Sequence, residues 1–171
     1  MTVSVIHGGE RSLDAWVEPV SQALEELANK LGLGQRGPCL PRSSVPSGLS
    51  GAHITLSSED SSTRIAILAG ASGVQALARA LFVSMSPPKL VLDEITDAVC
   101  ELANILAGLI KVKLGPDGSV LATSLPVFFH GNISPHLGDS WLCFETSLAD
   151  TRVTVMVIGG WAQMRTPAAS G

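Results

Sequence analysis

The stretch Asp93–Leu114, DEITDAVCELANILAGLIKVKL, predicts one long helix and organises the rest of the chain. Its apolar residues recur at three- and four-residue intervals, which is typical of the buried side of an amphipathic helix. These residues are Ile95, Val99, Leu102, Leu106, Leu109 and Ile110. Asp93 is the predicted N-cap, and the turn Gly115-Pro116-Asp117-Gly118 ends the helix.

The opposite side of this helix carries a polar track, which consists of Asp97, Glu101, Asn104, Gly108 and Lys111. A solvated helix face is the ordinary interpretation of such a pattern. Two of its residues, Asn104 and Gly108, favour a functional surface instead. Asn is a mediocre residue inside a helix, because its side chain competes for backbone hydrogen bonds. Gly108 costs about 1 kcal/mol relative to Ala and leaves room for the approach of another protein's backbone.

The elements around the long helix predict an α+β domain with an antiparallel sheet packed against long helices. An amphipathic helix is expected over 12–31, followed by a Pro-, Ser- and Gly-rich loop over 35–50. Short intervals between the β-prone runs favour antiparallel pairing. The expected strands are 51–56, 63–68, 121–129, 141–147 and 152–158, and a second helix is expected over 73–83.

A short repeat predicts that the domain has two pseudo-symmetric halves. Glu26-Leu27-Ala28-Asn29 recurs as Glu101-Leu102-Ala103-Asn104, each time on a helix that precedes a hairpin. The first copy is an incomplete match, because Gln22 stands where Asp97 stands in the second and the helix ends at Gly32. Glu26 and Asn29 are therefore interpreted as a degenerate second site.

Composition bounds the class of protein. The chain has 171 residues, of which 46% are hydrophobic and 15% charged, with a net charge of −4. This predicts a single domain over 1–171, with a core over 12–160 and a flexible tail over 161–171. Eleven scattered basic residues argue against nucleic acid. No uninterrupted apolar run is long enough for a membrane span, and no signal peptide is evident, so a cytoplasmic protein is expected.

Two further signals are set aside. His130, His136 and Asp139 share a loop, but their spacing fits no ordinary metal site, and the three Cys residues are widely separated, so no metal is expected. Gly70-Ala71-Ser72-Gly73 precedes a helix, but it lacks the Lys of a phosphate-binding loop, so a strand-to-helix turn is the better interpretation.

At the long helix the sequence resembles the CheC/CheX/FliY group of chemotaxis phosphatases, and most of all its CheX branch. The stretch from Asp97 to Gly108 is similar to the family pattern D-x-x-x-E-x-x-N followed by small residues. Segments 50–56 and 64–67 resemble the family's first hairpin, and 124–127 with Gly131 resembles the strand after its long helix. The resemblance covers about 12–160 and implies a CheC-like fold.

The resemblance implies hydrolysis of the aspartyl phosphate of a CheY-type response regulator. Asn104 is expected to position the attacking water and Glu101 to engage the regulator's active-site Lys, with Asp97, Gly108 and Lys111 as partner-binding residues. The chain needs no cofactor of its own, because Mg²⁺ is expected to come from the regulator. A homodimer is expected from the CheX relatives. The alternative is a non-catalytic CheC-like module that binds a regulator or a flagellar-switch or signalling partner, and a structural domain with a wet helix face is a third interpretation.

Overall fold

The computed structural model describes residues 13–33, 40–59, 61–82, 90–131, 133–136, 139–148 and 151–159. The helices are α1 (Asp14–Lys30), α2 (Ala71–Leu81), α3 (Leu92–Lys113) and α4 (Pro116–Ser119). The strands are β1 (Leu40–Pro41), β2 (Ser50–Ser57), β3 (Ser62–Ala69), β4 (Ala122–Thr123), β5 (Val127–His130), β6 (Ser140–Leu148) and β7 (Thr151–Gly159). The tail expected over 161–171 lies outside these ranges.

The strands form one sheet in the order β1-β6-β7-β3-β2-β4, and β5 also pairs with β2. Every strand pair in the described part of the chain is antiparallel, which confirms the predicted class. The hairpins β2–β3 and β6–β7 meet at the central β3–β7 pair. The short strand β1, which follows α1, pairs with β6, whereas β5, which follows α3, pairs with β2. This exchange accords with two related halves, but the duplication stays a prediction.

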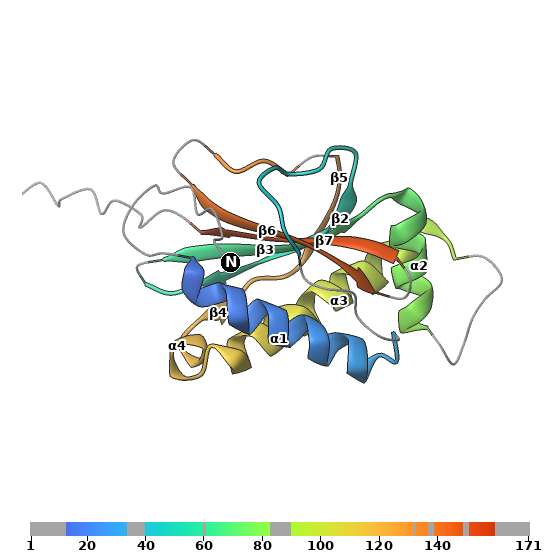
Figure 1. The fold of residues 1–171 in the computed structure, drawn as a ribbon. Coiled ribbons are helices and arrows are strands. Elements are labelled where there is room, and N and C mark those ends of the chain that lie inside the picture. The colour runs from blue at the N-terminus through green and yellow to red at the C-terminus, as the bar shows by residue number, and fades with distance from the viewer. Residues whose placement is uncertain are drawn as a thin grey trace, which may run out of the picture.

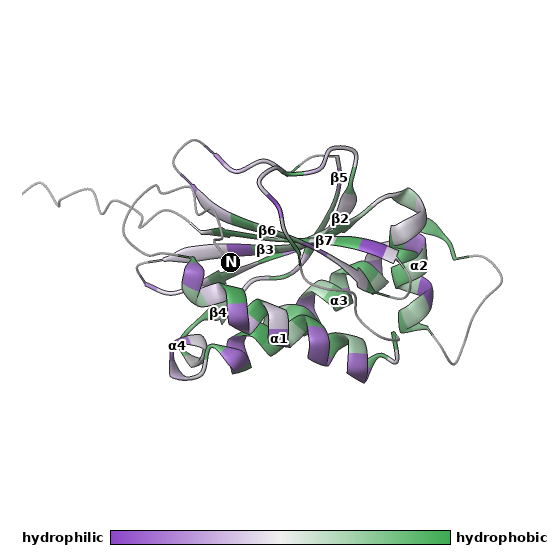
Figure 2. Ribbon diagram, in the orientation of Figure 1, coloured by the Kyte–Doolittle hydropathy of each residue, from purple (hydrophilic) through white to green (hydrophobic). Residues whose placement is uncertain are grey.

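The helices α1 and α3 lie together on one face of the sheet (Figure 1). Both carry hydrophilic and hydrophobic stretches side by side, as amphipathic helices do (Figure 2). The main core fills the space between them and the sheet, and a smaller apolar cluster of Ala66, Leu68, Ile133, Cys143, Met156 and Ile158 covers the other face. Within the described ranges, no helix has both the length and the hydropathy that crossing a bilayer requires.

The long helix forms nearly as predicted, with one correction at its start. All six residues of its predicted apolar stripe are buried. The predicted N-cap, Asp93, is wrong, because the helix begins at Leu92 and the capping position is Val91. The Val91 backbone N–H donates to Glu94 Oε2 over 2.9 Å, which satisfies a donor at the helix start. Asp93 instead places its charge in the first turn, where the helix dipole favours an acid.

Three predicted segments differ in detail. The strand expected over 121–129 is divided into β4 and β5, because Ser124 turns its hydrogen bonds onto Thr55 of β2 and Pro126 has no N–H to donate. The loop expected over 35–50 contains β1. The turn after α3 includes the single-turn helix α4, which follows Gly115 at φ 65°.

Candidate functional site on helix α3

The polar track of α3 lies on the outside of the molecule, as its spacing predicts. Asp97, Glu101, Asn104 and Gly108 are exposed, and Lys111 is half-buried. The opposite side of the helix packs against α1, α2 and β2. Because three elements hold this helix in place, the side chains of the track project from a rigid element, which is the usual requirement for precise positioning.

A groove of about 410 Å³ opens at the C-terminal half of the track. The structure brings three predicted site residues together there, namely Asn104, Gly108 and Lys111. It adds Val112, Gly115 and Thr123, which the sequence analysis did not identify. Lys111 Nζ donates to Thr123 Oγ1 over 3.3 Å and so joins α3 to β4 across the groove. Asp97 and Glu101 are not among the residues that line it, and they lie two turns and one turn before Asn104, respectively.

Gly108 has no packing role that explains its presence. A Cβ placed on it meets no atom within 4 Å, and its backbone does not need a left-handed conformation. Glycine therefore weakens the helix here without relieving any internal clash. What it does provide is a flat stretch of helix surface directly beside Asn104.

The first copy of the repeat has a different environment. Glu26 Oε1 lies 2.9 Å from Lys30 Nζ, and its Oε2 lies 2.7 Å from Lys113 Nζ on α3. The hydrogen bond from Lys113, followed by that from Lys30, lowers the pKa of the Glu26 carboxyl from 4.5 to about 2. The carboxylate thus ties α1 to α3. Asn29 is exposed, but α1 ends at Lys30, before any counterpart of Gly108.

The Glu26 ion pairs predict a specific dependence of stability on pH. Because the folded-state pKa lies below the ordinary value, the ion pairs stabilise the fold above about pH 5 and are lost as the pH falls towards about 2. Glu26→Gln should therefore be less stable than the wild type at pH 7 and equally stable near pH 2. Urea unfolding of both proteins at several pH values measures this, and a difference that does not change with pH would contradict it.

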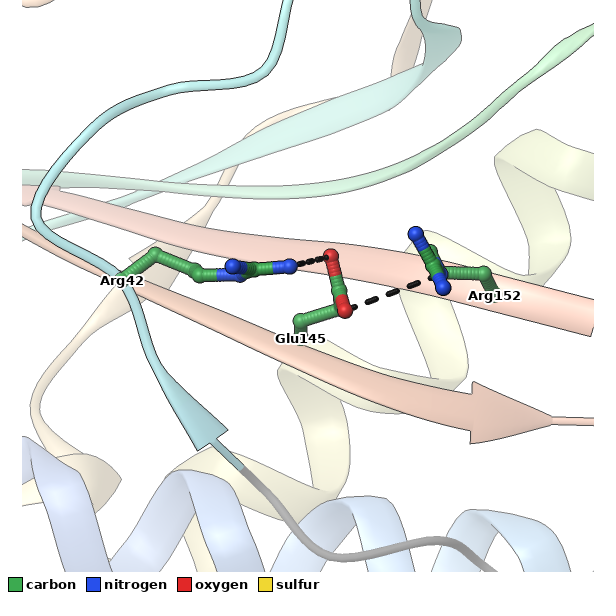
Figure 3. Close-up of polar contacts among 3 residues, drawn as sticks. All are labelled: Arg42, Glu145 and Arg152. Atoms are coloured by element: carbon green, nitrogen blue, oxygen red, sulfur yellow. Dashed lines mark hydrogen bonds and ion pairs between the residues drawn. The ribbon is translucent and has the colours of Figure 1, made fainter.

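A second cavity, of about 820 Å³, lies elsewhere and includes Gly70, Ser72 and Gly73 at the start of α2. Its charged residues are already engaged with one another (Figure 3). Glu145 Oε2 lies 2.5 Å from Arg42 Nη2, and its Oε1 lies 3.6 Å from Arg152 Nε. The hydrogen bond from Arg42 lowers the pKa of the Glu145 carboxyl. These contacts fasten the segment after β1 to the sheet, and Gly70 caps α2 as the predicted strand-to-helix turn.

His130, His136 and Asp139 do not share one loop as predicted, because His130 is the last residue of β5 and pairs with β2, whereas His136 and Asp139 follow that strand. His130 Nδ1 lies 3.3 Å from Ser50 Oγ, and the His136 backbone N–H donates to Asp139 Oδ2 over 2.8 Å. Among the residues described, no group of three or more His, Cys, Asp and Glu side chains is arranged to hold a metal ion.

Comparison with known proteins identifies relatives of this chain. A family model described as chemotaxis phosphatase CheX matches residues 50–134. The fold is similar to CheX of Desulfovibrio desulfuricans, with a TM-score of 0.68 and 16% identity over 85% of this chain and 99% of that one. CheX of Vibrio vulnificus gives a TM-score of 0.68 and 18% identity, again over 85% and 99%. No curated protein matches the sequence.

A third similar structure contains a bound partner. It is the CheX–CheY–BeF₃–Mg²⁺ complex of Borrelia burgdorferi, with a TM-score of 0.65 and 21% identity over 85% of this chain and 98% of that one. At such identities the structural likeness establishes the fold. The predicted CheC-like fold is thereby confirmed.

Proposed function

The chain belongs to the CheC/CheX family, and we propose that it hydrolyses the aspartyl phosphate of a CheY-type response regulator. Two findings support this proposal in general terms. The matching family model is that of a chemotaxis phosphatase, and one relative was crystallised with CheY, BeF₃ and Mg²⁺. The observation that carries it to particular residues is the exposed amide of Asn104 at an open groove on the rigid helix α3.

The reaction needs a water molecule placed in line with an already activated phosphoryl group. The water oxygen attacks phosphorus, the bond from phosphorus to the aspartyl oxygen breaks, and inorganic phosphate and the free carboxylate are the products. Positioning supplies most of the catalysis in such a step. The Asn104 amide carries a donor and an acceptor on one short side chain, so it orients the water without placing negative charge beside the phosphoryl group.

Glu101 lies one turn before Asn104 and is assigned to the contact with the regulator. Its carboxylate pairs with the active-site Lys of the regulator and sets the register in which Asn104 enters. Asp97 and Lys111 extend the contact in the two directions along the helix. The bare surface at Gly108 admits the regulator's backbone next to Asn104.

Mg²⁺ is assigned to the regulator and not to this chain. Bound there, it neutralises charge that develops on the transferred phosphoryl group. The residues of the polar track then have two tasks, which are to hold the water and to hold the regulator. A catalyst of this kind needs no cluster of cations of its own, which agrees with the sparse basic residues of the chain.

A phosphate-release assay tests the proposal. A CheY-type regulator is phosphorylated, and phosphate release is followed with and without this protein in the presence of Mg²⁺. Faster release with the protein is the expected result. Binding of the regulator without faster release would favour the non-catalytic interaction module instead.

Glu101→Ala is expected to weaken both regulator binding and turnover. Loss of one desolvated ion pair should raise the Kd about tenfold, which corresponds to about 1.4 kcal/mol. Glu101→Gln should behave similarly if the charge is what matters. Binding is measured by titration with the activated regulator, and a fully active Glu101→Ala protein would remove the assigned contact with Lys.

The same proposal places the chain in the cytoplasm, where CheY-type regulators act. The expected homodimer is also retained as a proposal, and sedimentation of the purified chain tests it. A monomer over the working concentration range would exclude it.

A further inference from the structure

Exposed apolar side chains gather beside the α3 groove. Leu125 is 85% exposed and Val112 is 72% exposed, although both are large hydrophobic residues. Val120, directly after α4, is also exposed. Apolar side chains that cluster on a surface are typical of sites that contact another protein.

The segment from β4 to β5 runs along α3 in the opposite direction, and two contacts define its register. At one end Lys111 Nζ bonds to Thr123 Oγ1, and at the other Cys100 is hydrogen-bonded to the Phe128 backbone. Eleven helical residues rise about 16.5 Å, and five extended residues span about the same length. The two segments therefore stay side by side between these contacts.

This register places Leu125 opposite the middle of the polar track. Two extended residues beyond Thr123 correspond to about 6.6 Å, or between four and five helical residues back from Lys111. Leu125 is thus level with residues 106 and 107, between Asn104 and Gly108. Cys100 and Lys111 lie on nearly one line of the helix, and Asn104 lies about 40° from that line. The amide of Asn104 consequently lies at the junction of α3 with this segment.

An interface of ordinary area that is centred on Asn104 also extends over Leu125. A specific protein complex buries about 800 Å² on each partner, which is a disc of about 16 Å radius. A partner that brings a phosphoryl group to Asn104 must cover Val112, which lines the groove, and Leu125, which the register places level with residues 106 and 107, because both lie within that radius. The exposed apolar side chains are therefore part of the surface that such a partner meets.

We propose that Leu125 and Val112 form an apolar docking rim that receives an apolar patch beside the phosphorylation site of a response-regulator receiver domain. This proposal rests on the phosphatase function proposed above. The polar track then orients the reacting groups, whereas the rim contributes affinity for the regulator. Leu125 is accordingly a specificity-determining residue and not a catalytic one.

Leu125→Ala and Leu125→Gln test the rim separately from the chemistry. The probe is the receiver domain activated with BeF₃⁻ and Mg²⁺, and Kd is measured by titration. Both variants should bind about tenfold more weakly, and the KM for the phosphorylated regulator should rise by a similar factor. The turnover rate at saturation should stay unchanged, because Asn104 is untouched. The matched control is Leu40→Ala, which alters a half-exposed apolar side chain on β1 at the other edge of the sheet and should leave Kd unchanged.

Each outcome bears on one proposal or the other. Wild-type Kd in both Leu125 variants, together with loss of turnover in Asn104→Ala, would overturn the docking rim and leave the phosphatase function standing. A wild-type protein that neither binds nor dephosphorylates any of a panel of phosphorylated receiver domains would overturn both. If Leu125→Ala instead changes the chain alone from dimer to monomer with no change in Kd for the receiver, the rim is a contact between copies and the proposal is wrong.

Discussion

Asn104→Ala is expected to remove the stimulated hydrolysis of the regulator's aspartyl phosphate while leaving the fold intact. The residual rate should return to that of the regulator alone, a loss of about 100-fold or more in the stimulation, because an unpositioned water rarely lies in line with phosphorus. Stability should be unchanged or slightly higher, since Asn104 is exposed and Ala is the better helix residue. Single-turnover phosphate release measures the rate, and urea unfolding checks the fold.

Asn104→Asp tests whether the hydrogen-bonding chemistry of the amide matters, or only the size of the side chain. The carboxylate has nearly the shape of the amide, but it carries negative charge towards the phosphoryl group and has no donor. It should fail as completely as the Ala variant. Asn29→Ala, at the corresponding position of α1, is expected to keep full activity, because the neighbouring Glu26 is held by Lys30 and Lys113. Normal phosphate release from either Asn104 variant would show that this amide is not the catalytic group.

Gly51→Ala is expected to produce the largest loss of stability of any single change considered. Gly51 lies in β2 opposite Leu68 of β3 and Phe129 of β5. A Cβ there would lie 2.0 Å from the Ile67 carbonyl oxygen, which is backbone and has no way to move aside alone. The strands β2 and β3 must separate locally, at a cost of about 3 kcal/mol or more. The urea midpoint of unfolding measures the effect.

Gly108→Ala is the matched control for this change. Its Cβ meets no atom within 4 Å, so the substitution should stabilise α3 by about 1 kcal/mol through helix propensity alone. One glycine thus serves close packing and the other does not, and the two substitutions should change stability in opposite directions. If Gly51→Ala unfolds within about 1 kcal/mol of the wild type, the close approach of β2 and β3 is wrong.

The fold was largely predictable because its elements are strongly periodic. The two long helices and the two hairpins formed within about two residues of their predicted bounds. In each of them the spacing of the apolar residues matches either the helical repeat of 3.6 residues or the strand repeat of two, and only that structure buries them all on one side. The errors lie where that signal is weak. The two-residue strand β1 has too few residues to show an alternation. The division of β4 from β5 depends on the hydrogen bond from the Thr55 backbone N–H to Ser124 Oγ, and these two residues are 69 positions apart in the sequence.

The sequence by itself determined which side of α3 is buried and which side is free, and so it selected Glu101, Asn104 and Gly108 as candidates. This was possible because the helical repeat of apolar residues can be recognised within a single stretch of sequence. Only the tertiary structure decided what lies beside that free side. It placed Lys113 against Glu26, which engages the carboxylate of the first repeat in an ion pair, and it placed Thr123 beside Asn104 in the groove. Those neighbours follow from strand order and from how far an extended segment advances per residue compared with a helix, and neither is encoded in the pattern of a single element.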